Sequence, residues 1–222
     1  MEDGTIVAED SLLNPQVTYG EDVISRIAYT VHNKDGLERL NQAVLSAINR
    51  VAGRTVARWR KNCKRNDILD VVIVGNTCMH HLFLNMSPEH LGRSPFSAGI
   101  RCSLNLKARD LGIRVSPGAY VHVLPIEAGF VGADTIGMLI AEEPYLQDEF
   151  VLLVDIGTNG ELVLGSRRRL VSASCATGPA IEGGNIKHGM RAVPGAIATV
   201  KIDDDTKNVR FKVIGMESWN TN

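Results

Sequence analysis

The segment Phe150–Leu164 reads F-V-L-L-V-D-I-G-T-N-G-E-L-V-L. Two apolar runs flank a short polar turn with two glycines, which is the pattern of a strand, a tight turn and a second strand. Gly157 and Gly160 allow the backbone to turn sharply and to approach a ligand, because neither residue has a Cβ. The segment therefore predicts a β-hairpin with a carboxylate, Asp155, at the end of its first strand.

The polar residues of this hairpin are of the types that a nucleotide phosphate site uses. Successive N–H groups of a turn form a nest that suits an anion, and Thr158 and Asn159 add short side-chain donors. Asp155 is placed to hold a hydrated Mg²⁺, because that ion prefers one or two carboxylates together with water and phosphate oxygens. An ordinary glycine-rich hairpin, in which Asp and Asn only stabilise the turn, accounts for the same residues equally well.

The composition is that of a globular α/β protein. The chain has 222 residues, a net charge of −1 and 44% hydrophobic residues, so nothing indicates a polybasic surface. No apolar run approaches the ~20 residues that a membrane span needs, and the first residues lack the regions of a signal peptide. Four widely spaced cysteines without a C-x-x-C pair favour reduced thiols. We therefore expect a cytoplasmic protein that binds neither nucleic acid nor a membrane.

Predicted strands and helices alternate along the chain, which indicates an α/β fold with a mixed sheet. Strands are expected at 5–8, 68–74, 120–124, 150–154, 162–164, 170–174, 196–202 and 209–214, and the strand at 68–74 has a buried pattern. Helices are expected at 20–29, 35–60, 77–86, from about 135 to 142, and at 180–190. Residues 87–118 are predicted to form an irregular insertion with one short helix near 104–111. Residues 216–222 carry no structural signal.

Several motifs follow one another in the order that a known family has. They are Asn14-Pro-Gln16, Y-G-E-D-V-I-S-R at 19–26, V-G-N-T-C-M-H-H at 74–81, G-F-V-G-A-D at 129–134, D-I-G-T-N-G-E at 155–161, T-G-P-A-I-E-G at 177–183 and Gly189-Met190. Taken together, they resemble the reductive activators of corrinoid proteins. That family belongs to the superfamily of acetate and sugar kinases, heat-shock proteins and actin-like ATPases (ASKHA). The resemblance covers about residues 5–215.

This resemblance implies two ribonuclease-H-like lobes of the actin-like ATPase type, with a nucleotide bound between them. It also implies ATP-dependent reduction of an inactivated Co(II) corrinoid to Co(I) on a partner corrinoid protein of a methyltransferase system. ATP and Mg²⁺ are the implied cofactors, and an iron–sulfur domain delivers the electron in such proteins. Residues 1–145 would form the first lobe and residues 146–222 the start of the second. A homodimer is compatible with the resemblance.

The second phosphate motif of the superfamily carries over to the hairpin residue by residue. Asp155 would be the catalytic residue and would hold Mg²⁺ through water. The nucleotide-binding residues that the resemblance implies are Gly157, Thr158, Asn159, Gly160 and Glu161, with Asp134 and Glu182 beside them. Asp134 stands at a helix start, where a capping role accounts for it equally well. Glu182 is expected near the nucleotide or an interface.

Two other superfamily motifs are missing from the sequence. No Asp-Gly-Thr-rich first phosphate turn precedes Thr5, and no glycine-rich adenosine motif of the G-x-C-G-S-G kind follows Gly215. The cysteine spacing of a ferredoxin-type cluster is also missing. The sequence therefore predicts an internal fragment with weak or no ATP turnover, whose iron–sulfur cluster belongs to a missing flanking domain.

Two other functions stay open at this point. A small-molecule kinase of the same superfamily would need a substrate base in the opposing lobe. A nucleotide-gated interaction module would need no catalysis. The motifs at 14–16 and 74–81 favour an activator over a kinase, because they match the activator pattern.

Cys78, His80, His81 and His90 form a candidate metal cluster. On a helix, Cys78 and His81 share a face because they are three residues apart, whereas His80 points elsewhere. Zinc normally needs three or four convergent ligands. We therefore favour a partly buried helix with incidental histidines.

Two further groups of nucleophilic residues attract attention. Ser172, Ser174 and His188 are close in the sequence, but their order alone does not define a catalytic triad. Cys175 is expected to be a small buried side chain rather than a redox thiol, because that is the commoner state of a free cysteine.

Overall fold

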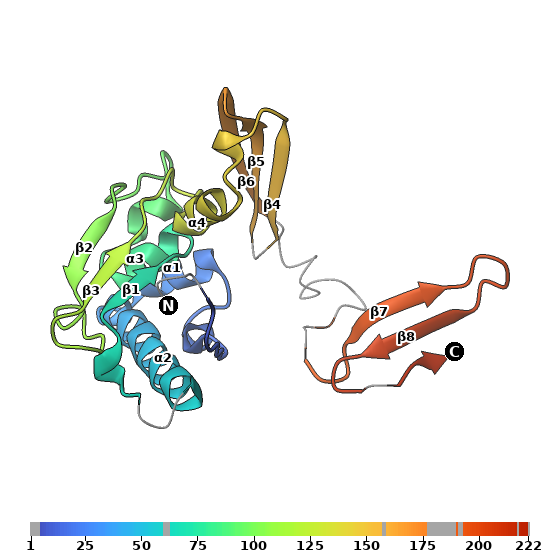
Figure 1. Cartoon of the computed structure of the whole chain (residues 1–222), viewed down its shortest axis with the longest axis horizontal. Helices are drawn as coiled ribbons and strands as arrows, with labels where there is room; N and C mark the ends of the chain where they lie inside the picture. The colour runs from blue at the N-terminus through green and yellow to red at the C-terminus, as the bar shows by residue number, and fades with distance from the viewer. Residues whose placement is uncertain are drawn as a thin grey trace. The chain divides into compact units, whose positions relative to one another are not determined.

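The computed structural model describes residues 5–59, 63–156, 159–176, 190, 193–216 and 218–221 (Figure 1). The chain divides into two compact units. The first consists of Met1–Leu153 with Leu162–Ala173, and the second of Val154–Glu161 with Ser174–Asn222. The boundary between the units crosses the three-stranded sheet within residues 151–176. Of this sheet, the described residues 154–156, 159–161 and 174–176 belong to the second unit.

The first unit is built on a three-stranded sheet with the order β1-β3-β2. β1 (Asp70–Ile73) pairs with β3 (Tyr120–Val123) in parallel, and β2 (Leu104–Lys107) pairs with β3 in antiparallel orientation. The predicted mixed sheet is therefore confirmed. The expectation that the strand near 68–74 is buried is wrong for one face, because β1 lies at the sheet edge and Val72 is 62% exposed.

The expected short helix near 104–111 is wrong, because the structure has strand β2 there. Its sequence, L-N-L-K, alternates apolar and polar residues, which suits a strand with one buried face. Leu104 and Leu106 lie on that face, opposite Val123 and Val121 of β3. This pairing with a strand some 15 residues further along determines the structure of β2.

The expected strand at Thr5–Ala8 is also wrong. This segment is described, but it forms no ladder with a described strand. The chain just beyond it is held instead by α2 (Gly36–Trp59), from which Arg54 and Arg58 each reach the carboxylate of Asp10 at 2.7 Å. Ion pairs to a helix thus take the place of strand pairing.

The other helices of the described chain lie close to their predicted positions. They are α1 (Val23–His32), α3 (Thr77–Phe83) and α4 (Ala133–Glu142). The structure also has short 3₁₀ helices that were not predicted, namely η1 (Pro15–Thr18), η2 (Arg65–Asp67), η3 (Glu89–Gly92) and η4 (Pro144–Leu146). α1 begins later than predicted because Asp22 caps it. The carboxylate of Asp22 accepts a hydrogen bond from the N–H of Ser25 at 2.7 Å, and the Ser25 hydroxyl accepts one from the N–H of Asp22 at 3.0 Å.

Two apolar clusters hold the first unit together. In one, Leu45 of α2 and Phe83 of α3 pack against Val121 and Val123, so both helices cover the same face of the sheet. The other joins α1, α2 and α3 and contains Val23, Ile27, Leu40, Cys78, Leu82 and Leu91. These contacts position the start of α3, directly after β1.

The hairpin predicted at 150–164 is confirmed. β4 (Val151–Ile156), β5 (Asn159–Ser166) and β6 (Arg169–Ala176) form a sheet in that order. Nothing is described of Gly157 and Thr158 in the turn. Of the predicted helix at 180–190, all but Met190 lies outside the described residues.

A third sheet follows near the end of the chain. β7 (Ile197–Ile202) and β8 (Val209–Val213) pair in antiparallel orientation, as predicted. Residues 216–222 carry no signal in the sequence, yet β9 (Asn220–Thr221) pairs with β8 through Arg210 and Phe211. The end of the chain is therefore structured in part, because two of its residues pair with a neighbouring strand.

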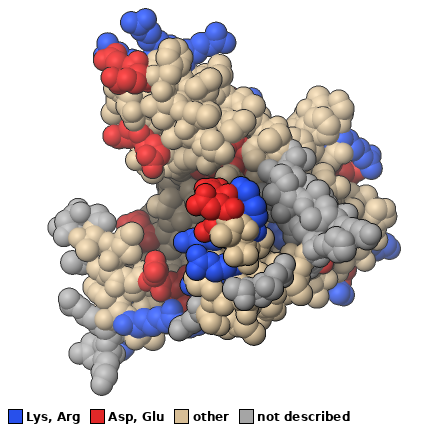
Figure 2. Space-filling view, turned by 90° about the vertical axis from the view of Figure 1, so that its right-hand side faces the viewer, with Lys and Arg blue, Asp and Glu red and all other residues tan. Residues whose placement is uncertain are grey.

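The architecture as a whole is α/β, as the sequence predicts. On the face shown in Figure 2, acidic and basic side chains lie interspersed among other residues, consistent with the net charge of −1. A search of the described helices found none with the length and hydropathy of a membrane span.

Candidate functional site

The turn between β4 and β5 brings together four of the predicted nucleotide-site residues. Asp155 is half-buried in β4, and Asn159 is half-buried at the first position of β5. Gly160 and Glu161 follow in β5 and are buried. Because β4 and β5 are neighbours in the sheet, Asp155 and Asn159 flank the same turn. The predicted residues Gly157, Thr158 and Glu182 lie outside the described part of the chain.

Glu161 has a structural partner that the sequence did not indicate. Its side chain is only 5% exposed, and its Oε1 accepts a hydrogen bond from the hydroxyl of Ser174 in β6 at 3.1 Å. A buried carboxyl group needs such partners, because its transfer from water into the protein costs free energy unless hydrogen bonds replace those to water. Ser174 therefore supports Glu161, and the hydrogen bond between them joins β6 to β5 of the hairpin.

Cys175 follows Ser174 and contacts the same strand. Its thiol donates a hydrogen bond to the carbonyl oxygen of Gly160 at 3.4 Å. The expectation of a buried Cys175 is wrong, since this residue is exposed. β6 is at the edge of its sheet, and no other strand of the described residues pairs with its outer side.

A second glycine-rich arrangement lies where two parallel strands of the first unit end. β1 leads through Gly75-Asn76 into α3, and the segment after β3 leads through Gly132 into α4. The carbonyl of Gly75 accepts hydrogen bonds from the N–H groups of Ala133 at 3.0 Å and Asp134 at 3.3 Å. A Cβ at Gly132 would lie 2.6 Å from the Cα of Asn76, so only glycine allows this approach. Ligands of open α/β sheets bind beside such carboxyl ends of strands.

Asp134 lies in the first turn of α4, where a negative charge is favourable to the helix dipole. Its Oδ1 accepts a hydrogen bond from the N–H of Thr135 at 2.9 Å. The capping position itself is occupied by Gly132, which has no side chain to contribute. Asp134 belongs to the first unit and Asp155 to the second, so the structure does not bring these two carboxylates together in one unit.

The candidate metal cluster is not assembled. His81 is buried, and its Nδ1 lies 2.7 Å from the carbonyl oxygen of Thr77, while its Nε2 lies 2.9 Å from the N–H of Gly99. The first contact requires a proton on Nδ1 and the second a free Nε2, so the ring is a neutral tautomer with both nitrogens engaged. Burial lowers the pKa of His81, which favours the same neutral form.

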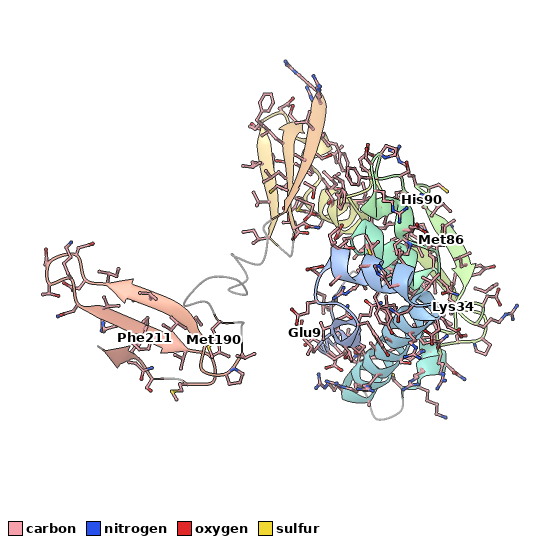
Figure 3. The ribbon with its side chains drawn as sticks, turned by 180° about the vertical axis from the view of Figure 1, so that it is seen from behind. Glu9, Lys34, Met86, His90, Met190 and Phe211 are labelled. Carbon is pink, nitrogen blue, oxygen red and sulfur yellow. The ribbon has the colours of Figure 1, made fainter. Side chains whose placement is uncertain are left out.

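The other members of that cluster do not converge either. Cys78 is buried, and burial raises its pKa to about 12, which favours the neutral thiol. His80 is buried beside His81, with 5.8 Å between the ring centroids. His90 lies exposed on η3 (Figure 3). Among the residues that the structure describes, no three His, Cys, Asp or Glu side chains could hold a metal ion.

Sequence comparison accounts for nearly the whole chain. Residues 1–146 match the RACo middle region, and residues 149–221 match the C-terminal domain of RACo, the ASKHA domain. A solved structure of a reductive activator for corrinoid,iron-sulfur protein superposes with a TM-score of 0.82 at 36% identity. The match covers 96% of this chain and 34% of that one.

Two curated relatives agree with these matches. The corrinoid activation enzyme RamQ of Eubacterium limosum is 34% identical over 212 residues, which are 96% of this chain and 35% of RamQ. A Co(II) methylated amine-specific corrinoid protein reductase of Methanosarcina barkeri is 46% identical over 71 residues, which are 32% of this chain and 13% of the reductase. The chain thus spans about a third of the length of RamQ and of the solved activator.

These findings define the class of protein first. The mixed α/β fold, the ASKHA match and the structural superposition identify an actin-like ASKHA protein. Within that class, the chain belongs to the RACo family. The family resemblance predicted from the sequence motifs is confirmed.

Proposed function

We propose that this chain forms part of the nucleotide-binding ATPase core of a reductive activator for a corrinoid protein. In this activity, ATP hydrolysis drives the reduction of an inactivated Co(II) corrinoid to Co(I) on a partner protein of a methyltransferase system. The observation that carries the proposal is the ordered match of residues 1–146 and 149–221 to two parts of the RACo family. The names of its relatives, which refer to corrinoid activation and to a Co(II) corrinoid protein reductase, support the same activity.

Within this proposal, the turn between β4 and β5 binds the phosphates of ATP, and Asp155 holds Mg²⁺ through coordinated water. The residues fit these ligands. Asp155 is only half-buried beside the turn, and Gly160 adds no side chain to its backbone. Mg²⁺ prefers one or two carboxylates and keeps several waters, so a single Asp155 suffices on the protein side. The bound ion would neutralise charge on the phosphates during hydrolysis.

The remaining residues of the motif position these groups. Gly157 and Gly160 let the backbone approach the phosphates, and Thr158 and Asn159 donate to them. The hydrogen bond from Ser174 to Glu161 anchors β5 directly after the turn, which keeps the donors in place. Asp134 and Glu182 are part of the proposal as acidic residues beside the nucleotide.

The proposal has further parts that concern the longer protein. Residues 1–145 contribute to a first ribonuclease-H-like lobe and residues 146–222 to a second, with ATP between them. The electron comes from an iron–sulfur cluster in a domain outside these residues. The protein acts in the cytoplasm, where its corrinoid partner would be encountered.

The decisive variant is Asp155→Asn in a protein that includes this chain together with its flanking domains. We expect about a hundredfold loss of ATP hydrolysis, because the variant would hold Mg²⁺ less well, and one preorganised electrostatic interaction with a transferring phosphoryl group is worth that much. ATP-driven Co(I) formation, followed by the corrinoid absorption spectrum, should fall in parallel. Asp148→Asn is the matched control, since Asp148 is exposed and pairs with Arg167 at the surface at 2.6 Å.

The results separate the proposal from the other two functions. Unchanged hydrolysis in Asp155→Asn would overturn the role of this carboxylate. Binding of the corrinoid protein without any ATP stimulation of cobalt reduction would indicate an interaction module. Transfer of phosphate from ATP to a small molecule, detected with labelled nucleotide, would indicate a kinase.

A further inference from the structure

A pocket of about 1040 Å³ lies in the first unit, away from the glycine turns that follow β1 and β3. Its walls come from α2, from the end of α3 and from the loop between β2 and β3. That loop sits at the amino ends of the parallel strands. The N–H of Ser116 donates to the carbonyl oxygen of Ile68, and the N–H of Tyr120 donates to that of Leu69, both at 3.2 Å. The pocket and the glycine turns therefore occupy opposite ends of the sheet.

Two buried asparagines of α2 fix the walls of this pocket. The side-chain amide of Asn41 donates to the carbonyl oxygens of Leu82 and Phe83 at 2.9 Å, which ties down the end of α3. The amide of Asn49 donates to the carbonyl oxygen of Gly112 at 2.9 Å, and its oxygen accepts from the N–H of the neighbouring loop residue 114 at 2.6 Å. One helix thus holds both opposing walls through buried polar side chains, so the pocket is preformed.

Three of the arginines that line the pocket lie beside one turn of α2. Arg50 follows Asn49 on α2, and the backbone of Arg114 is bonded to Asn49. Arg65 of η2 packs on the same helix face, because a Cβ at Gly53, three residues after Arg50, would overlap its guanidinium group. Arg50, Arg65 and Arg114 therefore all lie next to residues 49–53 of α2.

These three arginines have no acidic partner in the described chain. None of the ion pairs there involves Arg50, Arg65 or Arg114. The described lining contains a fourth arginine, Arg109, and one acid, Asp110, which lie 3.6 Å apart and pair with each other. A concave site lined by unpaired charges of one sign attracts ions of the opposite sign.

We infer that this pocket binds a small molecule that carries two or more phosphate or carboxylate groups. Guanidinium groups bind such oxygens in a bidentate manner, and several of them together recognise a multiply charged anion. The volume lies at the upper end of the range for small-molecule sites. The pocket also borders the apolar core, because the buried residues Leu45 and Phe83 belong to its lining. The inference does not rest on the proposed ATPase activity, because every described wall lies in the first unit.

The test is a calorimetric titration of the chain with inorganic pyrophosphate and with citrate, without added Mg²⁺ and at low ionic strength. We expect saturable binding that weakens as salt is added. The double variant Arg50→Gln with Arg114→Gln should bind each anion at least about tenfold more weakly, since it removes two charge-assisted contacts. Arg93→Gln is the matched control. Arg93 is an exposed arginine of the same unit, paired with Glu89 at 3.3 Å, and its loss should leave the affinity unchanged.

Three results would overturn the inference. The first is that neither anion binds the unmodified chain. The second is that the double variant keeps full affinity, which would place the anion at another site. The third is that an acidic peptide, such as an oligoglutamate, binds through the arginines while both small anions fail, which would make the pocket a protein-docking surface. Circular dichroism of the double variant would show that its fold is intact.

Discussion

His80 is a buried histidine whose two ring nitrogens have no hydrogen-bond partner among the described residues. It lines a cavity of about 270 Å³ whose other walls include Val44, Ile48 and Phe83. Burial, together with a smaller effect of the neighbouring His81, lowers the pKa of His80 to about 4. The residue is therefore neutral at pH 7 and contributes unsatisfied polar atoms to an apolar environment, which costs stability.

The substitution His80→Phe should make the chain more stable and less sensitive to acid. The pKa of His80 lies near 6.5 in the unfolded chain and near 4 in the folded one, so the unfolded chain binds the proton first. Protonation of His80 therefore leaves the free energy of unfolding unchanged above pH 6.5. It lowers the free energy of unfolding as the pH falls from 6.5 towards 4. This residue alone should account for about 2 kcal/mol of loss between pH 7.5 and 5.

Urea unfolding at these two pH values measures the effect. His80→Phe should raise the free energy of unfolding by about 1 kcal/mol or more at pH 7.5 and by a larger amount at pH 5. His81 retains its own lowered pKa, so some acid sensitivity should remain. The exposed His90 provides a control, because His90→Gln should change neither value. A destabilised His80→Phe variant with an unchanged pH dependence would show that the ring nitrogens have partners.

The hydrogen bond between Ser174 and Glu161 makes a second prediction at this scale. Ser174→Ala leaves one oxygen of a buried carboxylate with fewer partners, which should cost about 1 to 3 kcal/mol. Ser172→Ala is the matched control, because Ser172 lies two residues earlier in the same strand and is exposed. Thermal unfolding of both variants distinguishes them. Equal melting temperatures would mean that the hydroxyl of Ser174 does not support Glu161.

At the scale of the elements, the packing of α4 against the turn after β1 depends on Gly132. Gly132→Ala would place a Cβ 2.6 Å from the Cα of Asn76 and 2.8 Å from its carbonyl carbon, which are backbone atoms that cannot rotate away. Overpacking of this kind costs about 1 to 3 kcal/mol. Gly118→Ala is the control, because nothing lies within 4 Å of its Cβ position. Denaturant unfolding should therefore separate the two variants, and equal stability would mean that the turn can move apart.

The elements that the sequence predicted are those with strong local patterns. α2 has a long apolar stripe, and the hairpin around Asp155 has two apolar runs separated by glycines. The elements that it missed are short and depend on a distant partner. β2 exists through its pairing with β3, and β9 through its pairing with β8. Local propensity contains little information on such pairing.

The same distinction applies to the candidate site. The glycines and Asp155 are visible in seven consecutive residues, so the turn was predicted. The bond between Ser174 and Glu161 depends on the register of β5 against β6, which no local pattern reveals. The satisfied state of His81 could have been predicted in part, because Thr77 lies four residues earlier, where its carbonyl can reach the ring. The arginine pocket combines segments more than 60 residues apart and has no signature in the sequence.

At the scale of the whole molecule, the two units differ in how much of their surface they bury. β3 contributes the fully buried Val121 and Val123 to the core of the first unit. All six residues of β7 in the second unit are exposed. Regions with few buried apolar contacts open at lower free energy than a packed core. We therefore expect the sheet of β7, β8 and β9 to unfold before the first unit does.

The two tryptophans of the chain allow this order to be measured, because each reports on one unit. Trp59 lies at the end of α2, and Trp219 lies near β9 with the side chains of Lys201 and Lys212 each 5.2 Å from its ring. In urea, the fluorescence of a Trp59→Phe variant should change at a lower concentration than that of Trp219→Phe. The free energy of unfolding falls by about 1 to 3 kcal/mol per molar urea. Two transition midpoints that differ by about 1 M therefore correspond to free energies of unfolding that differ by about 1 to 3 kcal/mol. Coincident transitions would instead show that the chain unfolds as one cooperative unit.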